Sequence, residues 1–262
     1  MTKGVSIKFR SYSETVPKIL ELVKLDSELK KHSKIVLKPS VVFSKEGVLT
    51  STNCEFLEEV LKFCLANKNP VAEVFIAEGV DGKETMDVFN ELGYNRLAEK
   101  YSVGLIDLNN TEVEKVISHH FLKHQEIIYP RILSNSFLIS LPTLAASEET
   151  TILGSLSNML GAYPAKFYKG WFSGTKSKLR KWPMKYSVFD ILLCKMPDFA
   201  LFDSSGKGVI LAGMPLEIDK QAARLLGIDW KTVGYLRLVE ESFPEAKAKP
   251  KGQISPGSSP VS

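Results

Sequence analysis

The sequence contains few cysteines, and their spacing does not favour metal or disulfide chemistry. Only three occur in 262 residues, and no two of them stand in a C-x-x-C pattern. An iron–sulfur cluster usually needs four thiolates, so we expect neither a cluster nor a disulfide framework, and we predict no other cofactor. These cysteines are Cys54, Cys64 and Cys194.

Long apolar runs are also missing. No stretch approaches the roughly 18 apolar residues of a membrane span. Residues 1–20 lack the basic start and the apolar run of a secretory signal. We therefore expect a cytoplasmic protein with no transmembrane segment.

Motifs for phosphate loops, serine hydrolases and zinc sites are absent or incomplete. The run SSGKG around Lys207 lacks the first glycine of a phosphate loop and the Ser or Thr after its lysine, so it reads as a hairpin turn. No serine stands in G-x-S-x-G. His120 and His124 are four apart, as zinc ligands on one helix face are, but no second ligand pair accompanies them. We predict no metal site.

What the sequence does contain is an alternation of apolar strands and amphipathic helices. Apolar runs predict strands within 34–43, 72–79, 103–108, 135–142, 198–203 and 208–213. Helical spacing predicts helices within 14–31, 50–69, 83–94, 148–161, 188–197, 216–227 and 230–242. Thr52 or Asn53 is expected to cap the second of these helices, and Gly93 to end the third. The alternation predicts an α/β fold, with a largely parallel or mixed sheet and helices on both faces, in a single domain over residues 1–243.

The last residues differ in composition from the rest. From Pro244 onward the chain is almost free of large apolar residues and rich in Pro, Gly, Ser and Lys. Such a segment cannot offset the entropy of its own ordering by burial. We predict a disordered C-terminal tail over residues 244–262.

Several short motifs follow one another in an order that is similar to one known family. They are IVLKPSVV, TSTN, FIAEG, ELGY, GLIDL, FLISLP, LSNMLG and LAGMPLEIDKQAARLLGID. In their order and spacing the chain resembles the domain-of-unknown-function family 362, up to about Glu241. Members of that family often carry an added ferredoxin-type cluster domain, and we do not expect one here.

Relative to that family, several charged groups are replaced by neutral ones. The resemblance implies Lys-Pro-Asn where this chain has Lys38-Pro39-Ser40, and a run with two basic residues and a histidine where it has Pro142 to Ser147. It also implies a Lys-Asn pair at Ser157-Asn158 and an aspartate at Met214. Ala, Ser and Met cannot transfer protons or ligate a hard metal in place of such groups. An activity that the family has would therefore be lost or altered in this chain.

Seven residues remain as candidates for binding a small anionic or metal-bound ligand. Some follow predicted strands, where ligands lie in open α/β sheets, and others belong to the family motifs. Each also has a structural explanation, namely a solvated loop lysine, a common Glu-Gly turn, a helix stop or a helix cap. The candidates are Lys38, Ser40, Glu78, Gly79, Asn158, Gly161 and Asp219.

The segment 166–185 combines basic and aromatic residues and contains no acidic residue. Basic side chains neutralise phosphates and aromatic rings stack on bases, so the segment suits nucleic acid, an anionic lipid surface or an acidic protein. The alternative is a loop whose aromatic residues dock on the fold and cover the pocket. The candidates for polyanion binding are Lys166, Lys169, Trp171, Lys176, Lys178, Arg180, Lys181, Trp182 and Lys185.

Two classes of function therefore remain open. The first is a non-catalytic binding or scaffold protein on an enzyme-like fold, which uses segment 166–185 to bind an acidic partner. The second is an enzyme or ligand carrier that uses Lys38, Glu78, Asn158 and Asp219. The neutral replacements favour the first class, and convergence of those four side chains on one pocket would favour the second.

Overall fold

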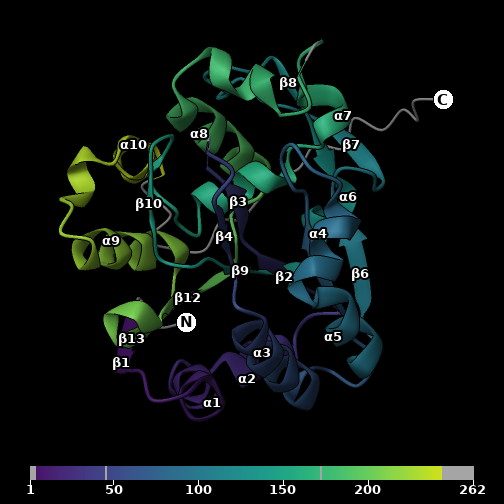
Figure 1. The fold of residues 1–262 in the computed structure, drawn as a ribbon, viewed down its shortest axis with the longest axis vertical. Helices are drawn as coiled ribbons and strands as arrows, with labels where there is room; N and C mark the ends of the chain where they lie inside the picture. The colour runs from purple at the N-terminus through teal and green to yellow at the C-terminus, as the bar shows by residue number, and fades with distance from the viewer. Residues whose placement is uncertain (1–3, 45, 172, 244–262) are drawn as a thin grey trace.

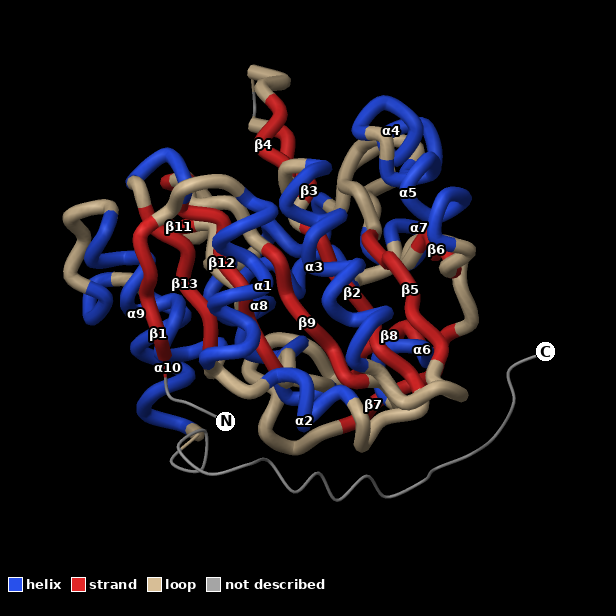
Figure 2. Tube along the Cα trace, turned by 90° about the horizontal axis from the view of Figure 1, so that it is seen from below, coloured by secondary structure: helices blue, strands red, loops and turns tan. Residues whose placement is uncertain are grey.

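A seven-stranded mixed sheet lies at the centre of the computed structural model, which describes residues 4–44, 46–171 and 173–243 (Figure 1). Figure 2 shows the strands side by side in the order β1, β13, β12, β9, β2, β5, β6. The strands from β12 to β6 are parallel to one another, whereas β13 is antiparallel to β12 and β1 is antiparallel to β13. The bounds are β1 (Gly4–Lys8), β2 (Lys34–Pro39), β5 (Glu73–Glu78), β6 (Gly104–Asp107), β9 (Phe137–Leu141), β12 (Phe199–Ser204) and β13 (Val209–Gly213).

Helices cover both faces of this sheet, as the alternation of strands and helices predicts. Successive side chains of β2 point to opposite faces, so Ile35 and Leu37 belong to one core and Val36 belongs to another. The first core packs against α1 (Tyr12–Leu22), α2 (Leu25–Leu29), α3 (Cys54–Asn67), α4 (Thr85–Leu92) and α5 (Tyr94–Tyr101). The second packs against α6 (Arg131–Ser134), α7 (Ala165–Tyr168), α8 (Met184–Cys194), α9 (Pro215–Leu225) and α10 (Gly234–Ser242).

Three small hairpins and four short 3-10 helices complete the described part of the chain. The β3–β4 hairpin continues directly from the end of β2 and projects beyond the edge of the sheet (Figure 2). The hairpins are β3 (Val41–Phe43) with β4 (Leu49–Ser51), β7 (Val113–Ile117) with β8 (Glu126–Pro130), and β10 (Ala146–Ser147) with β11 (Thr151–Ile152). The 3-10 helices are η1 (Ser157–Ala162), η2 (Ser177–Lys181), η3 (Ser205–Lys207) and η4 (Trp230–Thr232).

Three predictions from local sequence are confirmed: a helix cap, a helix end and a hairpin turn. The Asn53 side chain accepts hydrogen bonds from the amides of Glu55 and Phe56 and caps α3. Gly93 follows α4 with a φ of 79°, which a residue with a side chain rarely adopts. β12 and β13 form the predicted antiparallel hairpin, which places Lys207 in its turn.

Two predicted helices are wrong in different ways. The helix expected over 14–31 is divided into α1 and α2, because Lys24 between them adopts a left-handed conformation with a φ of 57°. The helix expected over 148–161 is replaced by β11, a turn and η1. The buried carboxylate of Asp219 accepts the amide hydrogens of Ser155 and Leu156, and Thr151 adopts a positive φ. A tertiary hydrogen bond thus overrides the helical pattern there.

Among the described residues, no helix combines the length and the apolar composition needed to cross a bilayer. The predicted tail, residues 244–262, lies outside the part of the chain that the structure describes.

Candidate functional site

The direction of the chain connections reverses between β2 and β9. From β2 the chain proceeds outward to β5 and β6, and from β9 it proceeds the other way to β12. Ligands of open α/β sheets bind outside the carboxyl ends of the strands at such a reversal. A cavity of about 590 Å³ lies there. Its lining comes from the β3–β4 hairpin, the loop after β5, the β10–β11 hairpin, η1 and η2.

Lys38, Glu78 and Asn158 form a hydrogen-bonded cluster beside this cavity. The Lys38 ammonium donates to Oε2 of Glu78 at 2.6 Å, and to the backbone oxygen and Oδ1 of Asn158 at 2.7 and 3.1 Å. The Asn158 amide donates back to the carbonyls of Lys38 and Pro39 and to the Ser140 hydroxyl. The cluster therefore joins the ends of β2, β5 and β9 to η1.

The electrostatics of this cluster are those of a buried ion pair. The side chains of Lys38 and Glu78 are almost completely buried, and Nζ of Lys38 lies 2.6 Å from Oε2 of Glu78. Burial lowers the pKa of the Lys38 ammonium, and the adjacent Glu78 carboxylate acts in the opposite direction. All three hydrogens of Lys38 have acceptors, so this lysine cannot bind an anion unless it leaves Glu78 or Asn158. Glu78 and Asn158 line the cavity directly.

Gly79 and Gly161 allow the chain to approach this cluster closely. A Cβ atom at Gly161 would overlap Oε1 of Glu78 and lie 2.7 Å from Nζ of Lys38. A Cβ atom at Gly79 would overlap the backbone oxygen of Gly161. Both glycines also line the cavity. Their role is therefore spatial: they make room for the ion pair at the cavity wall.

Asp219, another sequence candidate, lies behind the cavity and does not line it. Its carboxylate accepts hydrogen bonds from the amide and hydroxyl of Ser155, the amide of Leu156 and the Tyr235 hydroxyl. Burial raises the pKa of Asp219 to about 6, against the effect of those hydrogen bonds. Asp219 thus holds the turn before η1, which carries Asn158, and does not cap its own helix α9.

Sequence reasoning missed the role of Lys176 and Arg180, which it placed among exposed polyanion-binding residues. Lys176 is only 2% exposed, and its ammonium donates to the carbonyls of Gly79 and Gly161. Arg180 forms ion pairs with Asp81 at 2.8 Å and with Glu149 at 2.5 Å. Both basic residues line the cavity. Their acceptors lie 15 to 99 positions away in sequence, so no local pattern could have revealed them.

The rest of segment 166–185 only partly follows the expectation of docked aromatic residues. Tyr168 is buried, and its hydroxyl accepts a hydrogen bond from the amide of Ile128. Trp171 is 94% exposed and Trp182 is 63% exposed, so neither of them docks on the fold. The segment therefore covers the cavity with Lys176, Leu179 and Arg180, while its tryptophans face solvent. Phe172 lies outside the described residues.

The pair His120 and His124 does not form a metal site within the described residues, where no cluster of three metal-ligating side chains occurs. His120 lies in a turn and His124 in the loop before β8, so they do not share a helix face. The Nδ1 atom of His124 lies 3.0 Å from the buried carboxylate of Asp190, which also accepts three backbone amides of residues 122–124. The Asp190 carboxylate thus stabilises a loop.

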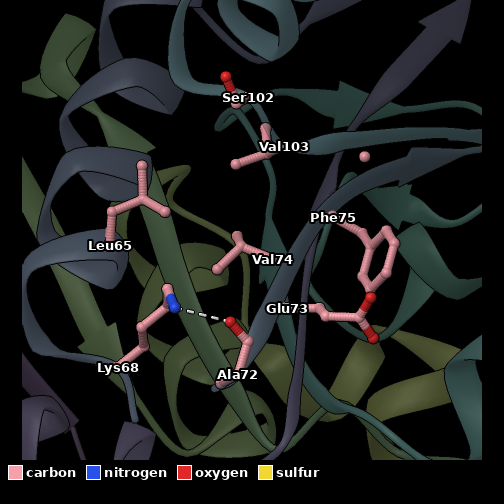
Figure 3. Close-up of a pocket in the computed structure, with 9 residues that line it drawn as sticks. Leu65, Lys68, Ala72, Glu73, Val74, Phe75, Ser102 and Val103 are labelled. Carbon is pink, nitrogen blue, oxygen red and sulfur yellow. Dashed lines mark hydrogen bonds between the residues drawn. The ribbon is translucent and has the colours of Figure 1, made fainter. Parts of the chain in front are cut away.

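A second, smaller cavity of about 280 Å³ lies at the opposite edge of the sheet, where β5 and β6 begin. Figure 3 shows the Lys68 ammonium directed at the carbonyl of Ala72, 2.7 Å away. The same ammonium also donates to the carbonyls of Asn69 and Pro70. The Lys68 ammonium is thus hydrogen-bonded to three backbone carbonyls. In the described part of the chain, the lining of this cavity contains no other cluster of polar side chains.

Comparison with known proteins places the cavity inside a family domain. The family model described as a domain of unknown function, DUF362, matches residues 35–208. The match begins in β2, ends between η3 and β13 and includes the residues that line the cavity. A search of curated proteins found no match.

Proposed function

We propose that this chain, which belongs to the DUF362 family, binds a small amphipathic organic molecule in the cavity outside β2, β5 and β9. The observation that carries the proposal is the position of the cavity at the reversal of chain direction, with the Lys38–Glu78–Asn158 cluster in and behind its wall. Its volume of about 590 Å³ lies in the range of small-molecule sites.

The wall chemistry supports an amphipathic ligand. Phe43, Leu153, Leu160, Leu179 and Met184 supply apolar surface. Polar groups then orient a ligand within such an apolar site. At the ends of β2 and β5 these are the Ser40 hydroxyl and the Glu78 carboxylate. Ser40 is almost completely buried, and within the described residues its hydroxyl makes no hydrogen bond, so it is available to a ligand.

Binding without conversion of the ligand fits this wall better than acid–base catalysis. The three hydrogens of the Lys38 ammonium are all bound, and the loop after β9 carries Thr143, Ala145 and Ser147 where the family resemblance implies two basic residues and a histidine. A general acid or base must exchange a proton with the ligand, and the Glu78 carboxylate in the wall is less suited to that role because it is held in an ion pair with Lys38. We therefore favour a ligand carrier or sensor, and segment 166–185 is its cover.

Filling the cavity is expected to block this binding. The fluorescent amphipathic anion 8-anilinonaphthalene-1-sulfonate should bind saturably to the wild-type protein. Leu160→Trp, which places a larger side chain in the cavity wall, should weaken that binding at least about tenfold, or about 1.4 kcal/mol. Leu22→Trp is the matched control, because Leu22 is exposed on α1 and does not line the cavity. Fluorescence titration measures both.

Equal binding by the Leu160→Trp and Leu22→Trp proteins would show that the probe lies elsewhere and would count against the proposal. The natural ligand can be sought by releasing small molecules from protein purified from cell extract and identifying them by mass spectrometry. The Leu160→Trp protein, purified in parallel, controls for molecules that adhere to other surfaces.

Polyanion binding by segment 166–185 is the second candidate, and the exposure of Trp171 and Trp182 favours it. Apart from the buried Lys176, five basic residues of the segment have no ion pair within the described residues, namely Lys166, Lys169, Lys178, Lys181 and Lys185. Exposed rings between unpaired cations suit single-stranded nucleic acid, and they also suit an anionic lipid surface or an acidic protein.

Removal of four of these charges should reduce the salt dependence of such binding. For a single-stranded oligonucleotide, each lost phosphate contact lowers the slope of log K against log salt by about 0.7, so four lost contacts lower it by about 3. The variant carries Ala at Lys166, Lys169, Lys178 and Lys181, and its control carries Ala at the exposed residues Lys18, Lys24, Lys30 and Lys207. Fluorescence anisotropy at several salt concentrations measures the slope.

Anionic vesicles and an acidic protein serve as parallel probes in the same titrations. If the wild-type protein binds none of the three in a salt-sensitive way, the second candidate is wrong, and the segment is a cover alone.

A further inference from the structure

Lys176 is a buried lysine that has no acidic partner. Its ammonium lies 2.7 Å from the carbonyl oxygen of Gly79 and 3.2 Å from that of Gly161, and two of its three hydrogens are thereby used. Among the described residues, no carboxylate lies within ion-pair distance of this ammonium. The Asp81 carboxylate accepts a hydrogen bond from the backbone amide of Lys176 and not from its ammonium. Lys38, by contrast, has the Glu78 carboxylate at 2.6 Å.

An ammonium buried in this way is costly, because neutral carbonyls replace the water around it only in part. Burial lowers the pKa of Lys176 to about 8, and the charge of Lys38 lowers it further, while Glu78 and Asp81 act in the opposite direction. At pH 7 about a tenth of the side chain is therefore a neutral amine. Neutral lysine amines in such surroundings are nucleophiles toward carbonyl groups.

The cavity gives this amine access to a ligand. Lys176 lines the wall together with Gly79 and Gly161, whose carbonyl oxygens hold the nitrogen in place. Leu179 and Met184, from the same part of the chain, add apolar surface next to it. A carbonyl compound with an apolar body can thus lie against these side chains with its carbonyl carbon at Lys176.

We propose that Lys176 is the attachment point for the ligand, and that its amine condenses reversibly with an aldehyde or ketone carbonyl in the cavity. This inference rests on the proposed ligand-binding function and names the chemical class of the ligand. The nitrogen lone pair forms a bond to the carbonyl carbon, which gives a carbinolamine. Both hydrogens of the neutral amine then leave with the carbonyl oxygen as water, and a C=N double bond remains.

The surroundings of Lys176 suit the product as well as the free amine. The imine nitrogen then takes one proton from water, and the new N–H can donate to the Gly79 carbonyl, the closer of the two acceptors. No oxidant or metal is needed, because condensation changes no oxidation state. The bond is hydrolysed by water, so a ligand held in this way can be released again.

The experiment uses butanal and sodium cyanoborohydride, which reduces an imine to a stable N-butyl lysine. The full chain is treated at pH 7, and peptide mapping by mass spectrometry gives the rate of labelling at each lysine. Lys176 should react at least about tenfold faster than the exposed Lys178, because the lowered pKa of Lys176 leaves about a tenth of its side chain neutral at this pH. The α-amine of the chain, also partly neutral at pH 7, is distinguished by its own peptide.

Three further measurements separate reactivity from a purely structural role. The rate at Lys176 should level off above about pH 8. Leu160→Trp should slow labelling at Lys176 and leave Lys178 unchanged. Lys176→Arg, which keeps the charge but cannot form an imine, should remove the fast phase, and Lys178→Arg should retain it.

Uniform labelling of Lys176 and Lys178 at pH 7, or a rate at Lys176 that rises to pH 10 without levelling off, would overturn the inference. Binding of the anilinonaphthalene probe then shows whether covalent attachment alone, or ligand binding in the cavity as well, is wrong. If that probe still binds in the cavity, only covalent attachment is wrong. If it does not bind there either, the proposed function fails with it.

Discussion

Glu78→Gln is expected to lower the free energy of unfolding by about 3–5 kcal/mol, the usual cost of breaking a buried ion pair from one side. The substitution keeps the shape of the side chain but leaves the Lys38 ammonium buried without its carboxylate. The Gln amide would also direct N–H groups at either Lys38 or the amide of Gly79, which now donates to Oε1 of Glu78. Urea unfolding at pH 7, followed by circular dichroism, measures the loss.

The pairwise part of that loss can be isolated by a double-mutant cycle. Lys38→Met removes the ammonium, and the double variant Lys38→Met/Glu78→Gln removes both charges. The double variant should be more stable than the sum of the single losses implies, by at least about 1.5 kcal/mol. Glu59→Gln is the control, because Glu59 pairs with the half-exposed Lys62 on α3 and should cost at most about 1 kcal/mol. A loss at Glu78 no larger than at Glu59, with additive single variants, would refute a coupled buried pair.

Gly161→Ala is expected to destabilise the fold by about 3 kcal/mol and to abolish binding of the anilinonaphthalene probe. Inserting a methyl group into a packed site costs about 1–3 kcal/mol, and here the methyl group would overlap the Glu78 carboxylate and crowd the Lys38 ammonium. Relief of that overlap requires either separation of the ion pair or movement of η1 into the cavity. Thermal unfolding and fluorescence titration measure the two effects.

Gly206→Ala is the matched control for this substitution. Gly206 lies in η3, where an added Cβ atom would meet no other atom within 4 Å. It should therefore unfold close to the wild-type temperature and bind the probe normally. If Gly161→Ala behaves like Gly206→Ala, the close packing of η1 against the Lys38–Glu78 pair does not limit stability or binding.

The sequence predicted best those residues of the candidate site that lie at the ends of strands. Lys38 and Glu78 are found at the ends of apolar runs, and parallel strands bring such ends to one edge of a sheet. The mixed sheet with helices on both faces follows from the same runs, since strands buried on two sides are largely apolar, as β9 is apart from Ser140. Local chemistry likewise predicted the Asn53 cap and the stop at Gly93.

The parts that sequence reasoning missed depend on contacts between distant residues. The run 148–161 has helical spacing, yet Asp219, 64 positions after Ser155, accepts hydrogen bonds from the amides of Ser155 and Leu156, which a helix would bond internally. Lys176 reads as one more cation in a basic run, and only the carbonyls of Gly79 and Gly161 explain its burial. Composition alone cannot separate a buried lysine from an exposed one.

The hydrogen bonds between Lys38 and Asn158 also have a consequence for how the chain folds. They join residues 120 positions apart, and long-range contacts of this kind form slowly because the entropy of closing the intervening loop must be met first. The segment from β2 to β6 can assemble its parallel strands earlier, while the Lys38 ammonium is still hydrated. The cavity then appears only when η1 docks on that half and water leaves the ion pair. Acquisition of ligand binding during refolding should therefore coincide with the final step and not with formation of the sheet.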